Sequence, residues 1–526
     1  MNLAREQFYY MRQNPLRLLI ILLLILSIFF RFTNLDRKVY WMDETFTSLW
    51  LSGYSVTEID TEVTGHIVSA EDLQKYQRLN PNRSAIDIIK NAPQLDALHP
   101  PLYYALLRLW VGWFGDSVAT IRTASAVISL LALPCAYWLG FNLFNSSRAA
   151  GLFAAIFAIS PFHVLYAQEA REYALWTVII LLSSAALLQA LRCNTKLSWI
   201  FYSFTIILGL YSYLLHCLVL LAHGLYVAIA EKFRLNKKSI SYLISSLAGS
   251  LAFIPWLLSV RDFSSPLWAT VKIEIVPLLK IAFLNLMRVF FDVDFNESNP
   301  LIYLIFLAIA ILVGYALYFS IARASLRVWL LILLLIGTTG AFIVLQDLLL
   351  GGRRSIGARY FIPCYLGIQL SVAYLFARQL DTAKAGSLQQ RFFKLILVLF
   401  FGLNVLSCAV SSQAQSWWNK YYNQDNPAIA EIVNQADRGL IIASFNSRDI
   451  LSLSYVLDPK TQIKFLSPTD LSQDISGNFS DLFLLNPSKD WLQKFQQSKN
   501  YKVERVYAGK YQELWRLKPK SAIRDR

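Results

Sequence analysis

The amino-acid sequence predicts a polytopic α-helical membrane protein that carries a small α/β domain at its C-terminal end. Only 16% of the 526 residues are charged, 56% are hydrophobic and the mean hydropathy is +0.43, whereas soluble domains carry about 25% charged residues. Apolar runs of roughly 20 residues, the length that crosses a bilayer, recur up to about residue 411. Beyond that point the apolar runs shorten to the length of single strands.

The long apolar runs are expected to be helices because backbone groups in lipid must be hydrogen-bonded within their own segment. We expect about eleven spans, each near the length that a bilayer requires. The expected spans cover 16–32, 117–139, 149–167, 173–191, 198–215, 217–231, 240–260, 300–321, 328–349, 360–379 and 392–411.

The basic residues indicate how these spans are oriented. The formal net charge of +15 would suit a nucleic-acid partner, but much of the excess lies in short loops between spans. With a cytoplasmic N-terminus every inner loop is basic, as the positive-inside rule requires. We therefore predict no nucleic-acid partner and, because the number of spans is odd, an extracytoplasmic C-terminus. The inner loops hold Arg148, Arg192, Lys196, Lys232, Arg234, Lys237, Lys238, Arg323, Arg327, Arg378, Lys384 and Arg391.

Two domains are expected, a membrane domain over residues 1–411 and an extracytoplasmic α/β domain over 412–526. The membrane domain includes a large outer loop, 33–116. Its apolar stretch 102–110 would reverse the later loops if it crossed the bilayer, so we expect a helix lying at the membrane interface. In the C-terminal domain we expect strands at 440–443, at 482–485 and around Val503 and Leu514, and a helix at 491–497.

An acidic pair, Asp43-Glu44, follows the first span directly. Charge beside a membrane is expensive and tends to mark function. A poorly solvated carboxylate has a raised pKa and can act as a general base. The alternative is an ordinary solvated pair in a loop, but the aromatic neighbours of the pair favour a functional role.

A second motif, His99-Pro100-Pro101, opens the apolar stretch of the outer loop. Proline is tolerated in the first turn of a helix and forces the preceding residue into an extended conformation. The stiff turn either aims His99 into a pocket or simply begins a helix beside a surface histidine. The residues alone do not separate these two interpretations.

Two further clusters are predicted on the outer side. The short turn between two spans holds Gln168, Glu169, Arg171 and Tyr173, which indicate either substrate binding, with the arginine facing an anion, or a local ion pair at a helix end. The loop 351–360 is rich in glycine and arginine, a composition that suits a phosphate. Generic binding of lipid headgroups is its alternative. Its candidate residues are Arg353, Arg354, Arg359 and Tyr360.

Other polar residues carry weaker signals. None of the five cysteines and no pair of histidines has the spacing of a metal site. An acidic outer cluster, Asp292, Asp294 and Glu297, is interpreted as a solvated loop rather than a cation site.

In this order, the motifs resemble those of the GT-C membrane glycosyltransferases, above all glycosyltransferase family 39, the dolichyl-phosphate-mannose–protein mannosyltransferases. The bacterial branch of that family includes the aminoarabinose transferases that modify lipid A. The resemblance covers residues 1 to about 411. It rests on the acidic pair, on His-Pro-Pro-Leu at 99–102, on Ser160-Pro161 ahead of Gln-Glu-x-Arg-x-Tyr at 168–173, and on Arg-Tyr-Phe-Ile-Pro at 359–363.

This resemblance implies an enzyme of the bacterial plasma (inner) membrane. It would move a sugar from a polyprenyl-phosphate donor to a lipid, glycan or protein acceptor at the extracytoplasmic face, by direct displacement with inversion. It assigns Asp43 as the base and Glu44 to positioning the acceptor or donor. Arg359, helped by Arg353 or Arg354, would hold the carrier phosphate. No cofactor is expected to be obligatory, although the carboxylates at 43–44 leave a divalent cation open.

The chain also departs from the family. It has no room for the β-trefoil domain of the mannosyltransferases in a central loop, which argues against protein O-mannosylation. A transporter or flippase of lipid-linked saccharides is the alternative function, since it too would need outer anion sites and many helices. Such proteins tend to show repeated halves, and this sequence contains no internal repeat. A membrane sensor would leave the clusters at Asp43 and Arg359 unexplained.

Overall fold

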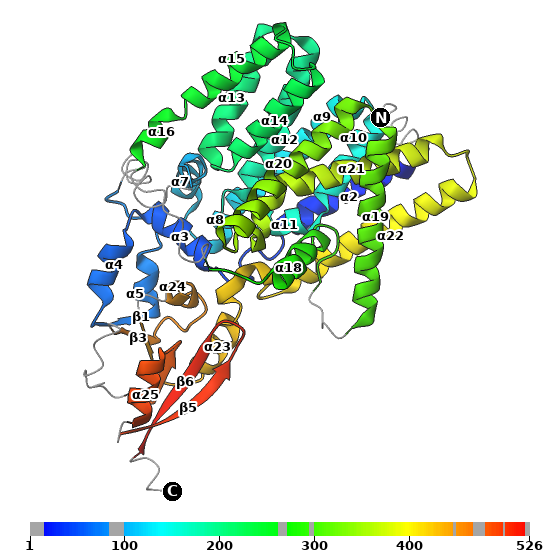
Figure 1. The fold of residues 1–526 in the computed structure, drawn as a ribbon. Coiled ribbons are helices and arrows are strands. Elements are labelled where there is room, and N and C mark those ends of the chain that lie inside the picture. The colour runs from blue at the N-terminus through cyan, green and yellow to red at the C-terminus, as the bar shows by residue number, and fades with distance from the viewer. Residues whose placement is uncertain are drawn as a thin grey trace, which may run out of the picture. The chain divides into compact units, whose positions relative to one another are not determined.

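The computed structural model describes residues 15–83, 99–260, 271–293, 299–444, 449–466, 479–497 and 500–520 (Figure 1). The chain divides into two compact units. The helical unit comprises Met1–Thr33, Ala92–Leu106 and Arg122–Ser412, and the α/β unit comprises Asn34–Asn91, Leu107–Ile121 and Gln413–Arg526. The last segment of the α/β unit begins at Gln413, and this unit also takes in most of the outer loop that we expected in the membrane domain.

Each of the expected spans is helical over most of its length. In the described part of the chain, eight helices are long and apolar enough to cross a membrane, and a bent helix pair would make a ninth. Helices α13 and α14 were predicted as spans but have only 17 and 15 residues, short of the roughly 20 that a bilayer requires. The polytopic helical fold is therefore confirmed, with fewer full-length spans than expected.

The helices of the helical unit follow one another in chain order, and α18 corresponds to none of the expected spans. They are α2 (Pro15–Phe32), α8 (Val118–Leu130), α9 (Ala132–Phe144), α10 (Ser147–Ala158), α11 (Pro161–Ala167), α12 (Tyr173–Cys193), α13 (Lys196–Ser212), α14 (His216–Ala230), α15 (Lys237–Leu251), α16 (Ile254–Ser259), α18 (Ile275–Met287), α19 (Pro300–Arg323), α20 (Leu326–Leu350), α21 (Ile362–Thr382) and α22 (Leu388–Gln413).

The bend between α10 and α11 measures 59° and occurs at Ser160-Pro161. Proline lacks an N–H group and holds the residue before it in an extended conformation, so the helix stops and restarts with Pro161 in its first turn. The Ser160 hydroxyl donates to the carbonyl of Val289 at 2.6 Å. This bond fixes the break, which leads directly into the turn before α12.

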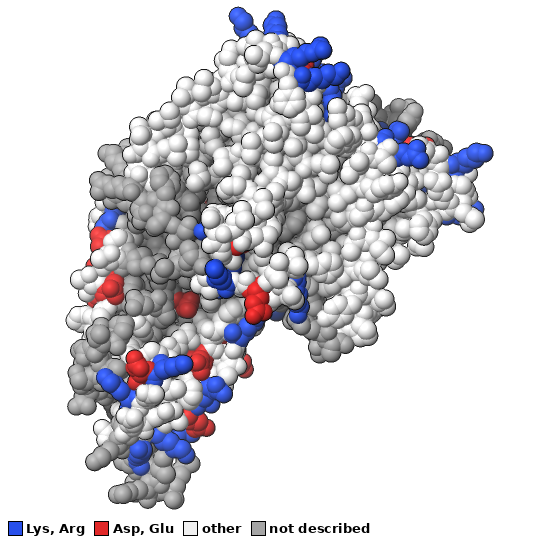
Figure 2. All heavy atoms as spheres, viewed as in Figure 1, with Lys and Arg blue, Asp and Glu red and all other residues white. Residues whose placement is uncertain are grey.

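Helices α12 and α21 are buried along nearly their whole length, whereas α15 and α19 expose most of their apolar side chains. An apolar surface of this extent suits contact with lipid. Figure 2 shows a broad face over the helices without charged side chains, and lysine and arginine residues gathered near the ends of α13, α14 and α15. The outer-loop helix α7 (Leu102–Phe114) has 13 residues, too few to cross a bilayer of ordinary thickness.

In its described part, the α/β unit contains one six-stranded sheet with the strand order β1-β3-β2-β4-β6-β5. Strand β2 pairs in parallel with β3 and β4, and the other pairs are antiparallel. The strands are β1 (Ile67–Ser69), β2 (Gly439–Ala443), β3 (Gln462–Phe465), β4 (Asp481–Leu485), β5 (Tyr501–Ala508) and β6 (Glu513–Pro519). The strands expected at β2, β4, β5 and β6 are present, whereas β1 and β3 were not expected.

Strand β1 comes from the outer loop and pairs with β3 through the register Val68 opposite Ile463. Besides α7, the described part of the outer loop supplies three helices, and that of the C-terminal segment supplies a short 3₁₀ helix, η3, and three helices of its own. These elements are α3 (Met42–Ser52), α4 (Val56–Val63), α5 (Ala70–Lys75), η3 (Trp418–Asn423), α23 (Asn426–Val433), α24 (Asp449–Leu453) and α25 (Lys489–Gln497).

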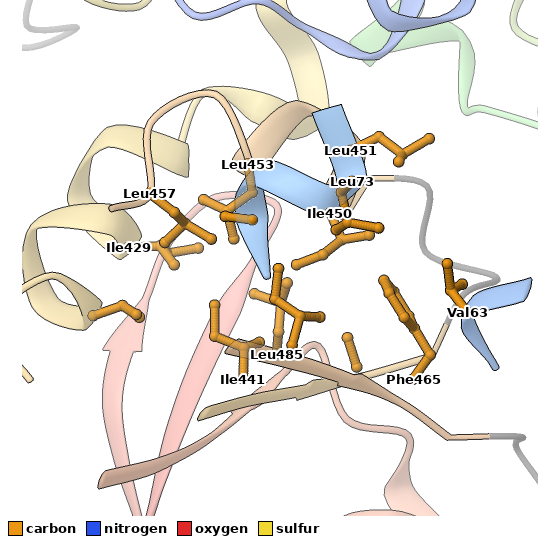
Figure 3. Packing of buried hydrophobic residues seen from close by; sticks show 14 of the residues in the cluster. Val63, Leu73, Ile429, Ile441, Ile450, Leu451, Leu453, Leu457, Phe465 and Leu485 are labelled. Atoms are coloured by element: carbon orange, nitrogen blue, oxygen red, sulfur yellow. The ribbon is translucent and has the colours of Figure 1, made fainter. Parts of the chain in front are cut away.

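The sheet buries side chains on both faces because neighbouring residues of a strand point to opposite sides. On one face, Ile441, Phe465 and Leu485 pack against Val63 of α4 and Leu73 of α5 (Figure 3). On the other face, Leu440, Ile442, Leu482 and Leu484 pack around Trp491 of α25. The outer loop and the C-terminal segment therefore share one hydrophobic core.

We expect Ile441→Ala to destabilise the α/β unit by about 2–5 kcal/mol, the cost of removing a large aliphatic side chain from a packed core. Ile441 is fully buried on β2, where it lies opposite Ile463 of β3 and Phe483 of β4. Pulse proteolysis of the purified protein in urea measures the change. Lys460→Ala, at an exposed position of the same unit, is the matched control and should leave the transition unchanged.

Candidate functional site

The predicted site residues fall into both units. Asp43 and Glu44 belong to the α/β unit, and the other candidates belong to the helical unit.

The carboxylate of Glu172 joins two of the motifs in the helical unit. Its Oε1 lies 3.3 Å from Nε2 of His99, and its Oε2 accepts a hydrogen bond from the Tyr104 hydroxyl at 3.2 Å. The guanidinium Nε of Arg171 lies 3.4 Å from the same oxygen. The Glu172 side chain is fully buried at the N-cap of α12, where the helix dipole favours a negative charge. The structure thus brings His99 to the 168–173 turn.

The prediction did not include Glu172 among the site residues. It lies in a turn where three ionisable residues occur together, and that density was the available signal. Which of the two glutamates faces His99 depends on how the turn folds. Glu169 is also buried, and its carbonyl accepts a bond from the Arg171 amide at 2.8 Å.

Gln168 acts on a different element. Its side-chain amide donates to the carbonyls of Phe30 at 2.8 Å and Thr33 at 2.9 Å. The last carbonyls of a helix have no partner within the helix, so Gln168 satisfies the C-terminal end of α2. This contact ties the first span to the turn that holds Glu172.

Arg359 reaches the same cluster from the other end of the sequence. Its guanidinium carbon lies 5.5 Å from the ring centroid of Tyr173 and 5.1 Å from that of Tyr360. The guanidinium of Arg171 lies 5.8 Å from the Tyr173 ring as well. The ring of Tyr173 therefore contacts two arginines at the first residue of α12, and cation–π contact restricts where each guanidinium can lie.

The loop that carries Arg353 and Arg354 is held by Asp347, near the end of α20. One carboxylate oxygen of Asp347 accepts from the Arg354 amide at 3.0 Å, and the other accepts from the amide and hydroxyl of Ser355 at 2.6 and 2.7 Å. The guanidinium Nη1 of Arg354 lies 3.7 Å from Asp347. Gly351, with a φ of +73°, lets the chain turn away from the helix.

Asp347, Asn285 of α18 and Arg288, which directly follows α18, were not among the predicted site residues. Asn285 donates to the carbonyl of Ile356 at 3.0 Å and accepts from Arg288 at 3.0 Å. Arg288 also lies 3.8 Å from Asp292. A lone aspartate in a long apolar helix was a usable signal for Asp347. The acidic residues Asp294 and Glu297, grouped with Asp292 in the sequence, lie outside the described residues.

In the α/β unit, Asp43 and Glu44 lie in the first turn of α3. The Glu44 side chain is completely buried and lies 3.2 Å from Nζ of Lys420, which is also buried. Asp43 is only partly buried. Lys420, in η3, was not predicted, because no local pattern links it to a residue some 376 positions earlier.

A third carboxylate lies on an element that packs against α3. Asp449 begins α24, which contacts both α3 and η3. Burial raises the pKa of Asp449, and the side-chain amide of Asn423 opposes that shift. Over the described residues, no three histidine, cysteine or acidic side chains are grouped so that they could hold a metal ion.

Comparison with known proteins shows what the chain resembles. Residues 98–258 match the sequence profile of the family described as dolichyl-phosphate-mannose-protein mannosyltransferase. That segment contains His99 and the whole 168–173 turn. No curated protein sequence matches the chain significantly.

Three solved structures are similar to this chain. The apo structure of ArnT from Cupriavidus metallidurans matches 94% of this chain and 97% of its own, with 13% identity and a TM-score of 0.51. ArnT bound to undecaprenyl phosphate matches over the same shares, with 12% identity and a TM-score of 0.47. The oligosaccharyltransferase of Archaeoglobus fulgidus in complex with Zn and sulfate matches 84% of this chain and 62% of its own, with 12% identity and a TM-score of 0.49.

The fold is therefore that of the GT-C membrane glycosyltransferases, as the motifs predicted. The profile match confirms the resemblance to the mannosyltransferase family over the segment that carries two of those motifs. The roles of the individual site residues stay predictions.

We expect Asp347→Ala to release the arginine loop, because the amides of Arg354 and Ser355 and the Ser355 hydroxyl lose their acceptor. Buried donors left unpaired cost about 1–3 kcal/mol each. Limited proteolysis with trypsin should then cut after Arg353 or Arg354 faster than in the unmodified protein. Asp490→Ala, at an exposed position of the α/β unit, should leave that rate unchanged. Equal cleavage in both variants would contradict the anchoring role of Asp347.

We expect Asp449→Asn to stabilise the α/β unit at neutral pH. A folded-state pKa raised above its unfolded value means that the folded protein holds its proton more tightly, so stability is lost as pH rises through the folded pKa. The asparagine carries no charge at any pH, and its advantage should therefore grow from pH 4 to pH 7. Thermal unfolding across that range measures the difference, and an advantage that shrinks with rising pH would contradict the shift.

Proposed function

We propose that this protein is an integral-membrane glycosyltransferase. It moves a sugar from a polyprenyl-phosphate-linked donor to a lipid, glycan or protein acceptor at the extracytoplasmic face of the plasma membrane of a bacterium, with its N-terminus in the cytoplasm. The profile match to a mannosyltransferase family supports the class of reaction. ArnT, whose apo structure shares the fold, is a protein that binds undecaprenyl phosphate.

One observation carries the proposal, namely the meeting of Arg359 and Arg171 on the ring of Tyr173 at the start of α12. The first amides of a helix have no partner within the helix and point outward, so a helix N-terminus attracts anions. Arginine presents a planar fork that matches phosphate oxygens. Two such side chains beside a helix N-terminus suit the phosphate of a prenyl carrier.

The proposed reaction is a single displacement at the anomeric carbon. The acceptor oxygen forms a bond to that carbon while the bond to the carrier phosphate breaks, and the electron pair leaves with the phosphate. The acceptor proton passes to the carboxylate of Asp43, which acts as the base. Arg359, aided by Arg353 or Arg354, neutralises the charge that develops on the leaving phosphate without needing a proton transfer.

The other predicted residues receive binding roles in this proposal. His99, Glu169, Arg171, Tyr173 and Tyr360 would contact the sugar or the phosphate. Gln168 would support these residues indirectly, because its side chain fixes the end of α2. No obligatory cofactor is proposed. A divalent cation at the 43–44 carboxylates stays open to a chelation experiment.

The purified protein tests the proposal when it is given a panel of polyprenyl-phosphate sugars and an extract of envelope lipids and glycans. We expect Asp43→Asn to abolish release of polyprenyl phosphate, and Arg359→Met to lower it by at least about 100-fold, the usual cost of removing one group that stabilises developing charge. Arg378→Met, at an exposed position near the end of α21, is the matched control and should retain full activity.

Two results would count against the proposal. Full turnover in Asp43→Asn would remove Asp43 as the base. Movement of the lipid-linked saccharide between leaflets, without consumption of the donor, would favour the alternative of a transporter or flippase.

A further inference from the structure

We propose that Lys420 is a positioning residue for Asp43, and that the η3 segment of the C-terminal region holds the helix turn that carries this catalytic base. The inference deepens the proposed function and rests on Asp43 being the base. It gives the segment that follows the last helix of the helical unit a part in catalysis, through α3 rather than through contact with the substrate.

The first observation is the ion pair between Lys420 and Glu44. The ammonium of Lys420 lies 3.2 Å from Oε2 of Glu44, and the two side chains are 1% and 0% exposed. The same oxygen accepts from the amide of Trp41 at 3.4 Å, and the ammonium lies 5.7 Å from the Trp41 ring centroid. Burying two charges is costly unless further bonds satisfy them, so this pair has a defined geometry rather than a loose one.

The second observation concerns the residue on the other side of Asp43. The amide of Met42 donates to Oδ1 of Asn423 at 2.8 Å, and Asn423 is fully buried. Met42 and Glu44 are thus both held by η3, while Asp43 between them remains partly exposed. A carboxylate on a backbone fixed on both sides keeps only its own side-chain torsions, which is the freedom a general base can tolerate.

The third observation is backbone strain in η3 next to Lys420. Tyr421 adopts φ 35° and ψ −117°, a conformation that a residue with a side chain rarely occupies. Its ring lies against Trp41 with 5.7 Å between centroids. Strain of this kind persists where the surrounding structure imposes it, and it gathers at functional sites. Lys420 and Asn423, which lie on either side of Tyr421, both contact α3.

The fourth observation ties η3 to the sheet. Asp425, two residues beyond η3, accepts from the Tyr507 hydroxyl at 3.0 Å and from the amides of Tyr511 and Gln512 at 2.8 and 3.0 Å. These donors lie in β5 or in the turn between β5 and β6. A chain of bonds therefore runs from the C-terminal hairpin through Asp425 and η3 to the turn that carries Asp43. The α/β unit supplies the rigidity that a short 3₁₀ helix lacks on its own.

A purely structural role for Lys420 would lower stability and leave the turnover of the folded enzyme unchanged. The positioning role predicts instead that kcat falls in folded enzyme while KM for the donor stays the same. The variants that separate the two are Lys420→Met, Lys420→Arg and the double variant Lys420→Met with Glu44→Gln. The double variant removes both charges and so leaves no buried charge unpaired.

In the transfer assay we expect Lys420→Met and the double variant to lose at least about tenfold in kcat, with KM for the polyprenyl-phosphate sugar unchanged, since small misplacements of a reacting group can cost about 100-fold. Lys420→Arg should recover part of the loss because it restores the charge. Lys494→Met, at an exposed position of α25, is the matched control with full activity. A folded double variant with unchanged kcat would overturn the inference.

A measurement that needs no turnover separates this inference from the proposed function. A nitroxide label on Asp43→Cys, in a background where the exposed Cys193 and Cys217 are serines, reports the mobility of position 43. We expect Lys420→Met to increase that mobility, and Lys494→Met to leave it unchanged. Unchanged mobility in Lys420→Met would overturn the positioning role alone, whereas full activity of Asp43→Asn would overturn the base itself.

Discussion

The helical unit depends on a carboxylate that cannot reach water. Glu172 is completely buried, and His99, Tyr104 and Arg171 converge on its carboxylate. In a low-dielectric interior each of those contacts is stronger than it would be in water, and the loss of any one is correspondingly costly. The start of α12 is therefore a fixed point from which Tyr173 presents its ring to Arg171 and Arg359.

Buried carboxylates hold neighbouring groups in place at two other positions. Asp347 accepts hydrogen bonds from two amides of the loop that begins with Gly351 and Gly352. In the α/β unit, Glu44 forms an ion pair with Lys420 and accepts a hydrogen bond from a backbone amide. In all three places a buried acid organises basic or amide groups around it. These acids therefore fix the conformation of the segments that carry the candidate arginines and Asp43.

The sequence was sufficient for the features that depend on local composition. Apolar runs identified the helices, and strands β2 and β4 were evident from their uninterrupted apolar residues. The span expected at 149–167 is two helices that meet at Ser160-Pro161, a bend that was not predicted. The helices α13 and α14 lie close to the expected ranges 198–215 and 217–231, and with 17 and 15 residues they are short for a full span. Strand β1 has only three residues, and it can be recognised as a strand only from its pairing with β3. Likewise, neither Glu172 nor Lys420 could be recognised without knowing which distant residue faces it.

The pairing of β1 with β3 also bears on biosynthesis. Ser69 ends one strand and Gln462 begins the other, so 393 positions separate two backbones that are hydrogen-bonded neighbours. At roughly 5–20 residues per second, a ribosome needs about 20–80 seconds to produce the second strand after the first. Throughout that interval β1 has no β3 to pair with, while most of the membrane helices are being synthesised. Nascent chains of this protein therefore have a long period in which a chaperone or a protease can reach residues 34–83, and truncation before residue 462 leaves that segment permanently exposed.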